Sequence, residues 1–133
     1  MIVVDSNVIA YCWINGPLTA LAQRVRVKDP DWHVPILWRS EMRSVLTGYL
    51  RDGSLTEPQI VRIMEAAEDA LTGSEHLVPS ASVFETAGKS RLSAYDCEFV
   101  ALASVLAVSL VTTDKAVLKA FPKRALTMEA FLD

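Results

Sequence analysis

The chain has 133 residues, of which 51% are apolar and 22% are charged, as in a folded domain and unlike a disordered segment. Its 13 Lys and Arg against 16 Asp and Glu leave a net charge of −3, which excludes a strongly basic nucleic-acid coat protein. Two cysteines, Cys12 and Cys97, are too few for a disulfide-dense scaffold. We expect a single domain over residues 1–133.

The first half of the chain alternates short apolar runs with helix-compatible stretches. In order, it predicts a strand, two helices, a second strand and two longer helices, at Ile2–Val4, Ser6–Ile14, Leu18–Val27, Trp32–Val34, Trp38–Arg51 and the segment from Thr56 to Gly73. Gly16 and Pro17 separate the first two helices. The fifth element has the clearest pattern, because its apolar residues recur at intervals of three and four.

The second half continues this alternation. In order, it predicts a strand, two helices, a strand, a helix, a weak strand and a terminal turn, at His76–Val78, Val83–Lys89, Ser93–Ala107, Ser109–Thr112, Lys115–Ala120, Ala125–Leu126 and Met128–Leu132. The helix over Ser93–Ala107 is apolar nearly all round, so we expect it to be buried by the sheet and also by a second subunit. Strands alternating with helices predict an α/β fold with a central parallel sheet.

Targeting signals are not expected. The chain begins with Met1 followed by three apolar residues and Asp5, without the basic start of a signal peptide. Its longest apolar run, Phe99–Val111, is interrupted by serines and is shorter than the about 20 residues of a membrane span. We therefore expect a cytoplasmic protein with free thiols.

Four acidic residues stand at element ends. Asp5 follows the first predicted strand and Asp114 the fourth, whereas Glu41 and Asp96 lie near the starts of helices. In parallel sheets, ligands bind outside the carboxyl ends of the strands, and helices begin at the same edge. The four carboxylates are therefore expected to converge. The alternative is that each acid only caps a helix or interacts with its dipole.

Converging carboxylates repel one another, at a cost of roughly 4 kcal/mol for two charges about 4 Å apart. A cation between them removes this cost, and sites made only of oxygen ligands suit Mg²⁺ or Mn²⁺. His33 and His76 are far apart in the sequence and no Cys–His set is present, so zinc is not expected.

An acid-lined divalent-metal site is suited to phosphodiester hydrolysis. Basic residues near these acids are candidates for contacts with a nucleic-acid backbone, or else ordinary surface charges: Arg39, Arg43, Lys89, Arg91 and Lys115. Three tryptophans are candidates for base stacking, although core packing is the better expectation for most of them: Trp13, Trp32 and Trp38.

Four segments, in this order, resemble PIN-domain ribonucleases, and most closely the VapC-type toxins of toxin–antitoxin pairs. They are Ile2–Ile9, the stretch from Pro35 through Glu41 to Leu46, Leu92–Ala103 and Leu110–Lys115. The resemblance implies a Rossmann-like three-layer α/β/α sandwich and Mg²⁺- or Mn²⁺-dependent endonucleolytic cleavage of RNA. It further implies a homodimer that is silenced by a separate antitoxin protein.

The resemblance also assigns roles to individual residues. It makes Asp5 and Asp96 the main metal ligands and Glu41 and Asp114 further or water-mediated ligands, all four being catalytic. Two residues would support the site, Thr112 by bracing it and Asn7 by orienting Asp5. The segments 18–31 and 54–73 match no motif of the family that we can name.

Other function classes fit less well. A receiver domain needs an acidic pair after the first strand and an acceptor aspartate after the third, where the chain has Pro79 and Ser80. A haloacid-dehalogenase-like phosphatase needs Asp-x-Asp, but Asp5 is followed by Ser6 and Asn7. No nucleophile elbow of a serine hydrolase is present. The remaining alternative is a degenerate PIN domain that binds RNA or protein without catalysis, and the presence of all four acids opposes it.

Overall fold

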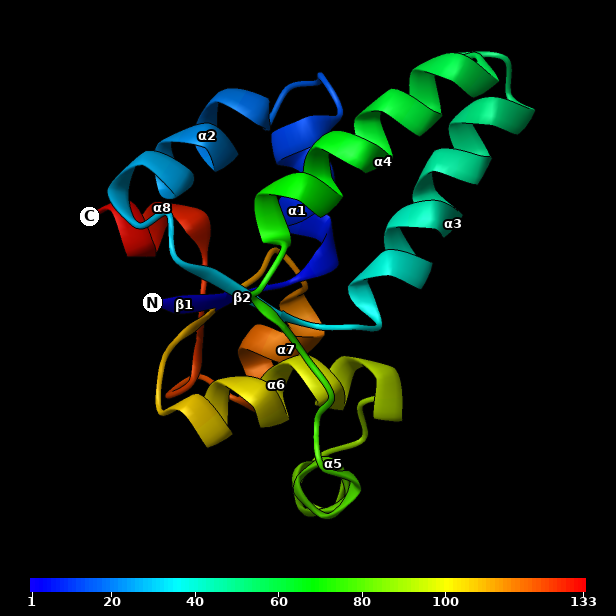
Figure 1. Ribbon diagram of the computed structural model, residues 1–133. Coiled ribbons are helices and arrows are strands. Elements are labelled where there is room, and N and C mark those ends of the chain that lie inside the picture. The colour runs from blue at the N-terminus through cyan, green and yellow to red at the C-terminus, as the bar shows by residue number, and fades with distance from the viewer.

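A five-stranded, all-parallel sheet forms the centre of the computed structural model, which describes residues 1–133 (Figure 1). Its strands are β1 (Ile2–Val4), β2 (Trp32–Pro35), β3 (Glu75–His76), β4 (Leu110–Val111) and β5 (Ala125–Leu126). Their order across the sheet is β3-β2-β1-β4-β5, and each neighbouring pair is parallel. The predicted α/β fold with a parallel sheet is confirmed.

Helices cover both faces of the sheet, which makes the three layers. They are α1 (Ser6–Trp13), α2 (Thr19–Lys28), α3 (Trp38–Arg51), α4 (Glu57–Leu71), α5 (Ser80–Ala87), α6 (Ala94–Leu106), α7 (Lys115–Ala120) and α8 (Met128–Leu132). Figure 1 shows α1, α2, α3, α4 and α8 on one side and α5, α6 and α7 on the other. The hairpin of α3 and α4 projects from the body of the molecule. No helix is both long and apolar enough to span a membrane.

The main differences from the sequence prediction concern β3, α5 and α8. β3 occupies Glu75–His76 and not His76–Val78, because its backbone pairs with Val34 and Pro35 at the end of β2. α5 begins at Ser80, directly after Pro79 and three residues before the predicted start. The expected terminal turn is the helix α8, whose first turn is capped by the Thr127 hydroxyl.

α6 is buried on more than one side, as its apolar sequence predicts. One face packs on β1, β2 and β4, and another packs against α5. Phe99, Val100 and Leu102 are at most 2% exposed. Because α5 covers the second face, most apolar side chains of α6 are buried within one chain, whereas Val105 is 54% exposed. The expected packing against a second subunit stays a prediction.

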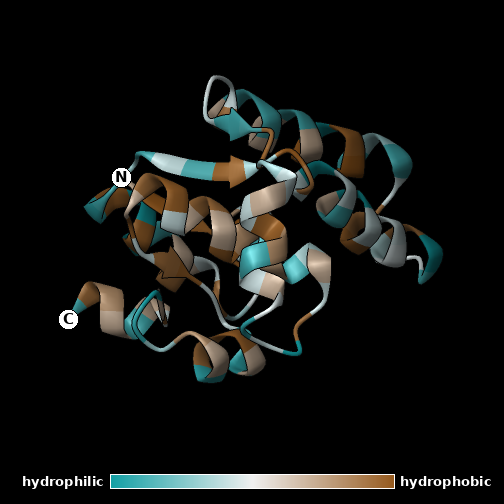
Figure 2. Ribbon diagram, turned by 90° about the horizontal axis from the view of Figure 1, so that it is seen from below, coloured by the Kyte–Doolittle hydropathy of each residue, from teal (hydrophilic) through white to brown (hydrophobic).

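The core lies between the sheet and its helices and takes up two of the three tryptophans. Trp32 is 2% exposed and Trp38 is fully buried. Trp13 packs edge-on against Trp32, with 6.0 Å between the ring centroids. Core packing is thus confirmed for Trp32 and Trp38, which are unavailable to stack on bases. Hydrophilic and hydrophobic bands alternate along the helices, as their amphipathic periodicity requires (Figure 2).

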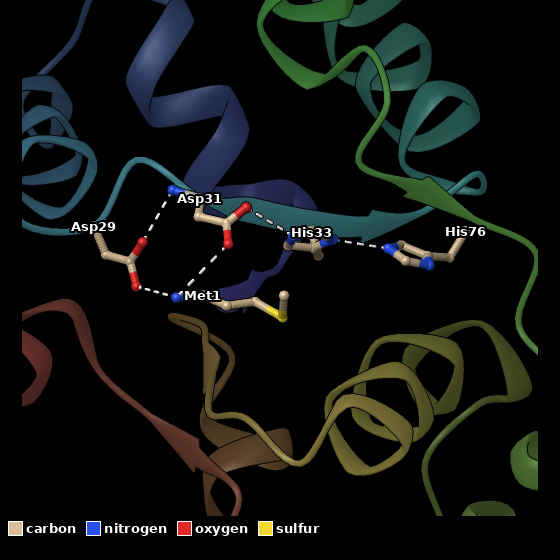
Figure 3. A network of polar contacts seen from close by, with 5 residues as sticks. All are labelled: Met1, Asp29, Asp31, His33 and His76. Carbon is tan, nitrogen blue, oxygen red and sulfur yellow. Dashed lines mark hydrogen bonds and ion pairs between the residues drawn. The ribbon is translucent and has the colours of Figure 1, made fainter.

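The two histidines are neighbours in space, although they are far apart in the sequence. His33 on β2 and His76 on β3 are hydrogen-bonded, with 2.8 Å between Nδ1 and Nε2 (Figure 3). The other nitrogen of His33 lies 2.8 Å from Asp31 Oδ1. Asp31 and Asp29 also face the amino group of Met1, at 4.0 and 2.7 Å. Parallel pairing of β2 with β3 brings the rings together across 43 residues of sequence.

Candidate functional site

The carboxyl ends of β1 and β4 form the point at which the strand order reverses. The two strands are neighbours, with Val3 paired to Leu110 and Val4 to Val111. The chain leaves β1 toward one face of the sheet and β4 toward the other (Figure 1). A crevice outside the strand ends is expected at such a point. Asp5 and the segment from Thr112 to Asp114 lie there, as the sequence predicts.

A pocket of about 600 Å³ opens at this edge, and we call it the acidic pocket. Four separate segments bring one carboxylate each to its wall: Asp5, Glu41, Asp96 and Asp114. The other lining residues are Ser6, Asn7, Leu37, Ser40, Ser44, Val45, Ser93 and Tyr95. The four acids that the sequence singled out therefore share one cavity, although they are spread over more than 100 positions of the chain.

Asp5 is the most deeply placed of these acids, with 9% of the residue exposed. Its Oδ1 accepts the Ser6 N–H at 2.8 Å and its Oδ2 accepts the Thr112 hydroxyl at 2.7 Å. Burial raises the pKa of Asp5 from 3.8 to about 6, against the lowering effect of these two hydrogen bonds. The negative charges of Glu41 and Asp96 add to the increase.

Thr112 connects two of the acids. Its hydroxyl donates to Asp5 and accepts the Asp114 N–H at 3.0 Å. Asp114 in turn caps α7, because its Oδ1 accepts the N–H groups of Ala116 and Val117 at 2.8 and 3.4 Å. One hydrogen-bonded chain thus fixes both strand ends, and the helix-capping interpretation of Asp114 is also correct.

Glu41 and Asp96 reach the pocket from the first turns of α3 and α6. Glu41 Oε1 accepts the Ser6 hydroxyl at 2.7 Å. Its pKa is raised by burial and by the charges of Asp96 and Glu98. The pKa of Asp96 is raised by burial and by the charge of Asp114. These mutual effects show that the carboxylates lie within electrostatic reach of one another.

The donor set of the acidic pocket suits a hard divalent cation. It consists of carboxylate and hydroxyl oxygens and the Asn7 amide, without histidine or cysteine. No three His, Cys, Asp or Glu side chains lie close enough together to bind one ion directly. Mg²⁺ does not require this, because it commonly keeps several waters and takes only one or two carboxylates. A cation would also offset the mutual repulsion that adds to burial in raising these pKa values.

The three basic residues expected to contact RNA have different surroundings. Arg39 donates to both oxygens of Glu75, at 2.6 and 2.8 Å, and also bonds Glu68. It therefore joins α3 to β3 and α4 and does not reach toward the acidic pocket. Arg43 borders a separate hollow between α3 and α4. Lys115 is exposed directly after Asp114 and is the one of these three next to the pocket-lining acids.

Some residues of the site were not singled out from the sequence. Ser6 donates its backbone N–H to Asp5 and its hydroxyl to Glu41, so it links two of the acids. Glu98 acts on Glu41 through its charge, and its position two residues after Asp96 is the only signal that the sequence offers. Asn7 does not bond Asp5; its Oδ1 accepts the Thr113 N–H at 3.4 Å.

Comparison with protein families matches the PIN domain to residues 2–123, which is almost the whole chain. The match covers the four segments on which the resemblance rests and all four acids of the pocket. Comparison with curated proteins gives no match.

Proposed function

Because the chain belongs to the PIN domain family, whose members are generally nucleases, we propose that it hydrolyses RNA phosphodiester bonds in the acidic pocket with Mg²⁺ or Mn²⁺. The observation that carries this proposal is the convergence of four carboxylates from four segments at the switch point of the sheet. If the four acids served only as helix caps, nothing would require them to line the same cavity.

In this function Asp5 and Asp96 would be the main ligands of the metal, and Glu41 and Asp114 would hold it through its bound waters. When bound, the ion activates a water and neutralises charge on the phosphodiester. The chain's own hydroxyls orient the ligands, because Thr112 donates to Asp5 and Ser6 donates to Glu41. Both bonds leave lone pairs free on the carboxylate oxygens.

The biological role that fits this activity is that of a VapC-type toxin, acting as a homodimer in the cytoplasm and silenced by a cognate antitoxin. The support is the order of the four resembling segments along the chain and the size of the chain. Expression of the chain alone is expected to arrest growth, and co-expression of the neighbouring reading frame is expected to relieve the arrest. Growth that continues at high expression would contradict the toxin role and leave the nuclease activity open.

The test of the nuclease activity uses labelled RNA with Mg²⁺, with Mn²⁺ and with a chelator. Asp96→Asn keeps the backbone N–H that the Ser93 hydroxyl accepts, so α6 retains its cap. We expect this variant to cleave on the order of a hundredfold more slowly, or to be inactive. Asp69→Asn is the control, because Asp69 is exposed in the last turn of α4 and lines neither the acidic pocket nor its supports. Cleavage by Asp96→Asn at the parent rate, or full cleavage with the chelator, would reject the proposal and favour a module without catalysis.

A further inference from the structure

A second hollow adjoins the acidic pocket, and we call it the uncharged groove. It has a volume of about 440 Å³, within the range of roughly 300–1,000 Å³ that is typical of ligand sites. The turn between α1 and α2 closes one side and α3 forms the other. Its lining residues are Asn7, Ala10, Tyr11, Ile14, Asn15, Gly16, Pro17, Leu18, Thr19, Val45 and Tyr49.

The groove continues directly from the acidic pocket. Asn7 and Val45 line both cavities and form the border between them. Asn7 lies at the start of α1, two residues after Asp5, and Val45 lies one helical turn after Glu41 on α3. A linear polymer with one unit in the acidic pocket would therefore place an adjoining unit in the uncharged groove.

The lining of the groove has the chemistry of a site for a flat, neutral ring. It holds no acidic or basic side chain, in contrast to the four carboxylates next to it. It has a tyrosine on each wall, Tyr11 on α1 and Tyr49 on α3. The amides of Asn7 and Asn15 add donors and acceptors, which is the combination that reads a base edge.

The two tyrosines differ in how they are held. The Tyr11 hydroxyl lies 3.4 Å from Thr113 Oγ1, which fixes the ring beside the segment after β4. Tyr49 is 38% exposed and Val45, one turn before it on the same face of α3, is 39% exposed. Apolar side chains thus face solvent where the groove is open, instead of entering the core.

We propose that the uncharged groove binds a nucleobase of single-stranded RNA, stacked on Tyr49, while an adjoining phosphate of the same strand occupies the acidic pocket. This inference rests on the proposed function. Stacking on an aromatic side chain requires an unpaired base, so duplex RNA does not fit. An apolar side chain of a protein partner is the other possible occupant, and the absence of charge in the groove favours neither. The continuity with the acidic pocket favours the base.

The test measures binding of a fluorescein-labelled single-stranded RNA, with Ca²⁺ in place of Mg²⁺ as a hard cation that takes oxygen ligands. Tyr49→Phe keeps the ring, Tyr49→Leu keeps apolar volume without a π face, and Tyr49→Ala removes both. Phe84→Ala is the matched control, because Phe84 is an exposed aromatic on α5, away from both cavities. Thermal unfolding of each variant checks that it is folded.

We expect Tyr49→Ala and Tyr49→Leu to weaken RNA binding about tenfold, which is the loss of one base–aromatic stack. Tyr49→Phe and Phe84→Ala should bind as the parent does, and the same RNA in a duplex should bind at least about tenfold more weakly. A series of RNAs, each with an abasic nucleotide at a different position, locates the stacked base. When that base is the missing one, the parent and Tyr49→Ala should bind the RNA with equal affinity.

Three results would overturn the inference in distinguishable ways. If the parent binds single-stranded RNA and all Tyr49 variants bind equally well, the groove holds no base and the nuclease proposal stands. If Tyr49→Leu binds RNA like the parent and only Tyr49→Ala is weak, the contact is apolar and not a stack. If the parent binds no RNA at all, the groove inference and the proposed function both fail.

Discussion

Replacing Asp5 by Asn tests whether the buried charge of Asp5 destabilises the folded protein, first through lost hydration and then through repulsion by Glu41 and Asp96. Asn caps helices as well as Asp does, so the N–H of Ser6 keeps its acceptor. The change removes a buried charge without removing volume. In the parent, Asp5 accepts a hydrogen bond from the Thr112 hydroxyl. In the variant, the Asn side-chain NH₂ group would instead donate a hydrogen bond to that hydroxyl.

The expected magnitude follows from the pKa of Asp5. A rise from 3.8 to about 6 on folding corresponds to about 3 kcal/mol of lost stability when the carboxylate is ionised. The changed contact with Thr112 offsets this by about 1 kcal/mol. Asp5→Asn is therefore expected to be about 2 kcal/mol more stable than the parent at pH 8.

The pH dependence has a definite sign. Between pH 3.8 and about 6 the folded parent binds more protons than the unfolded chain, so the cost of the charge is fully present above pH 6 and disappears as the pH falls through this window. The free-energy difference between variant and parent should shrink by about 2 kcal/mol from pH 8 to pH 4. The hydrogen-bond offset does not depend on pH and cancels in this comparison.

Urea unfolding of both proteins at several pH values, with a chelator present, measures these differences. Asp69→Asn is the control and should stay within about 0.5 kcal/mol of the parent throughout, as expected for an exposed site. A variant less stable than the parent at pH 8, or a difference that is constant from pH 4 to pH 8, would refute the electrostatic reasoning.

Three further predictions concern the elements that support the pocket. Arg39→Gln removes the hydrogen bonds to Glu75 and Glu68 and should lower the free energy of unfolding by about 1–3 kcal/mol; a loss below about 0.5 kcal/mol in urea would show that the network is dispensable. Mn²⁺ at about 100 times its dissociation constant should stabilise the parent by roughly 2.7 kcal/mol in thermal unfolding, and an equal shift in Asp96→Asn would place the ion elsewhere. Ser93→Ala removes the hydroxyl that caps α6 and should cost about 1 kcal/mol in urea unfolding, whereas unchanged stability would mean that the cap contributes nothing.

Local signals in the sequence were sufficient for most of the secondary structure. The apolar periodicity of α3 and the capping residue before α6 lie within the elements that they define. The prediction for β3 failed because its bounds depend on a distant partner. β3 ends at His76 because its pairing with β2 ends there. The residues from His76 to Val78 carry no local signal of this strand end.

The candidate site, too, could be predicted from the sequence only in part. That Asp5 and Asp114 follow strands is visible in the sequence, and so is the position of Glu41 and Asp96 at helix starts. Their convergence depends on β1 lying beside β4. The same strand order places His33 against His76. The partners of Arg39 are likewise visible only when β3 and α4 are placed beside α3.

By itself, the sequence determined the element types, the α/β class and the identity of the acids at the element ends, because these depend on residues within a few positions of each other. Only the tertiary structure decided which elements are neighbours, how far burial raises the pKa of Asp5, and where the uncharged groove lies. The physical reason is that desolvation and repulsion depend on distances between groups remote in the chain, and long-range packing of strands and helices sets those distances.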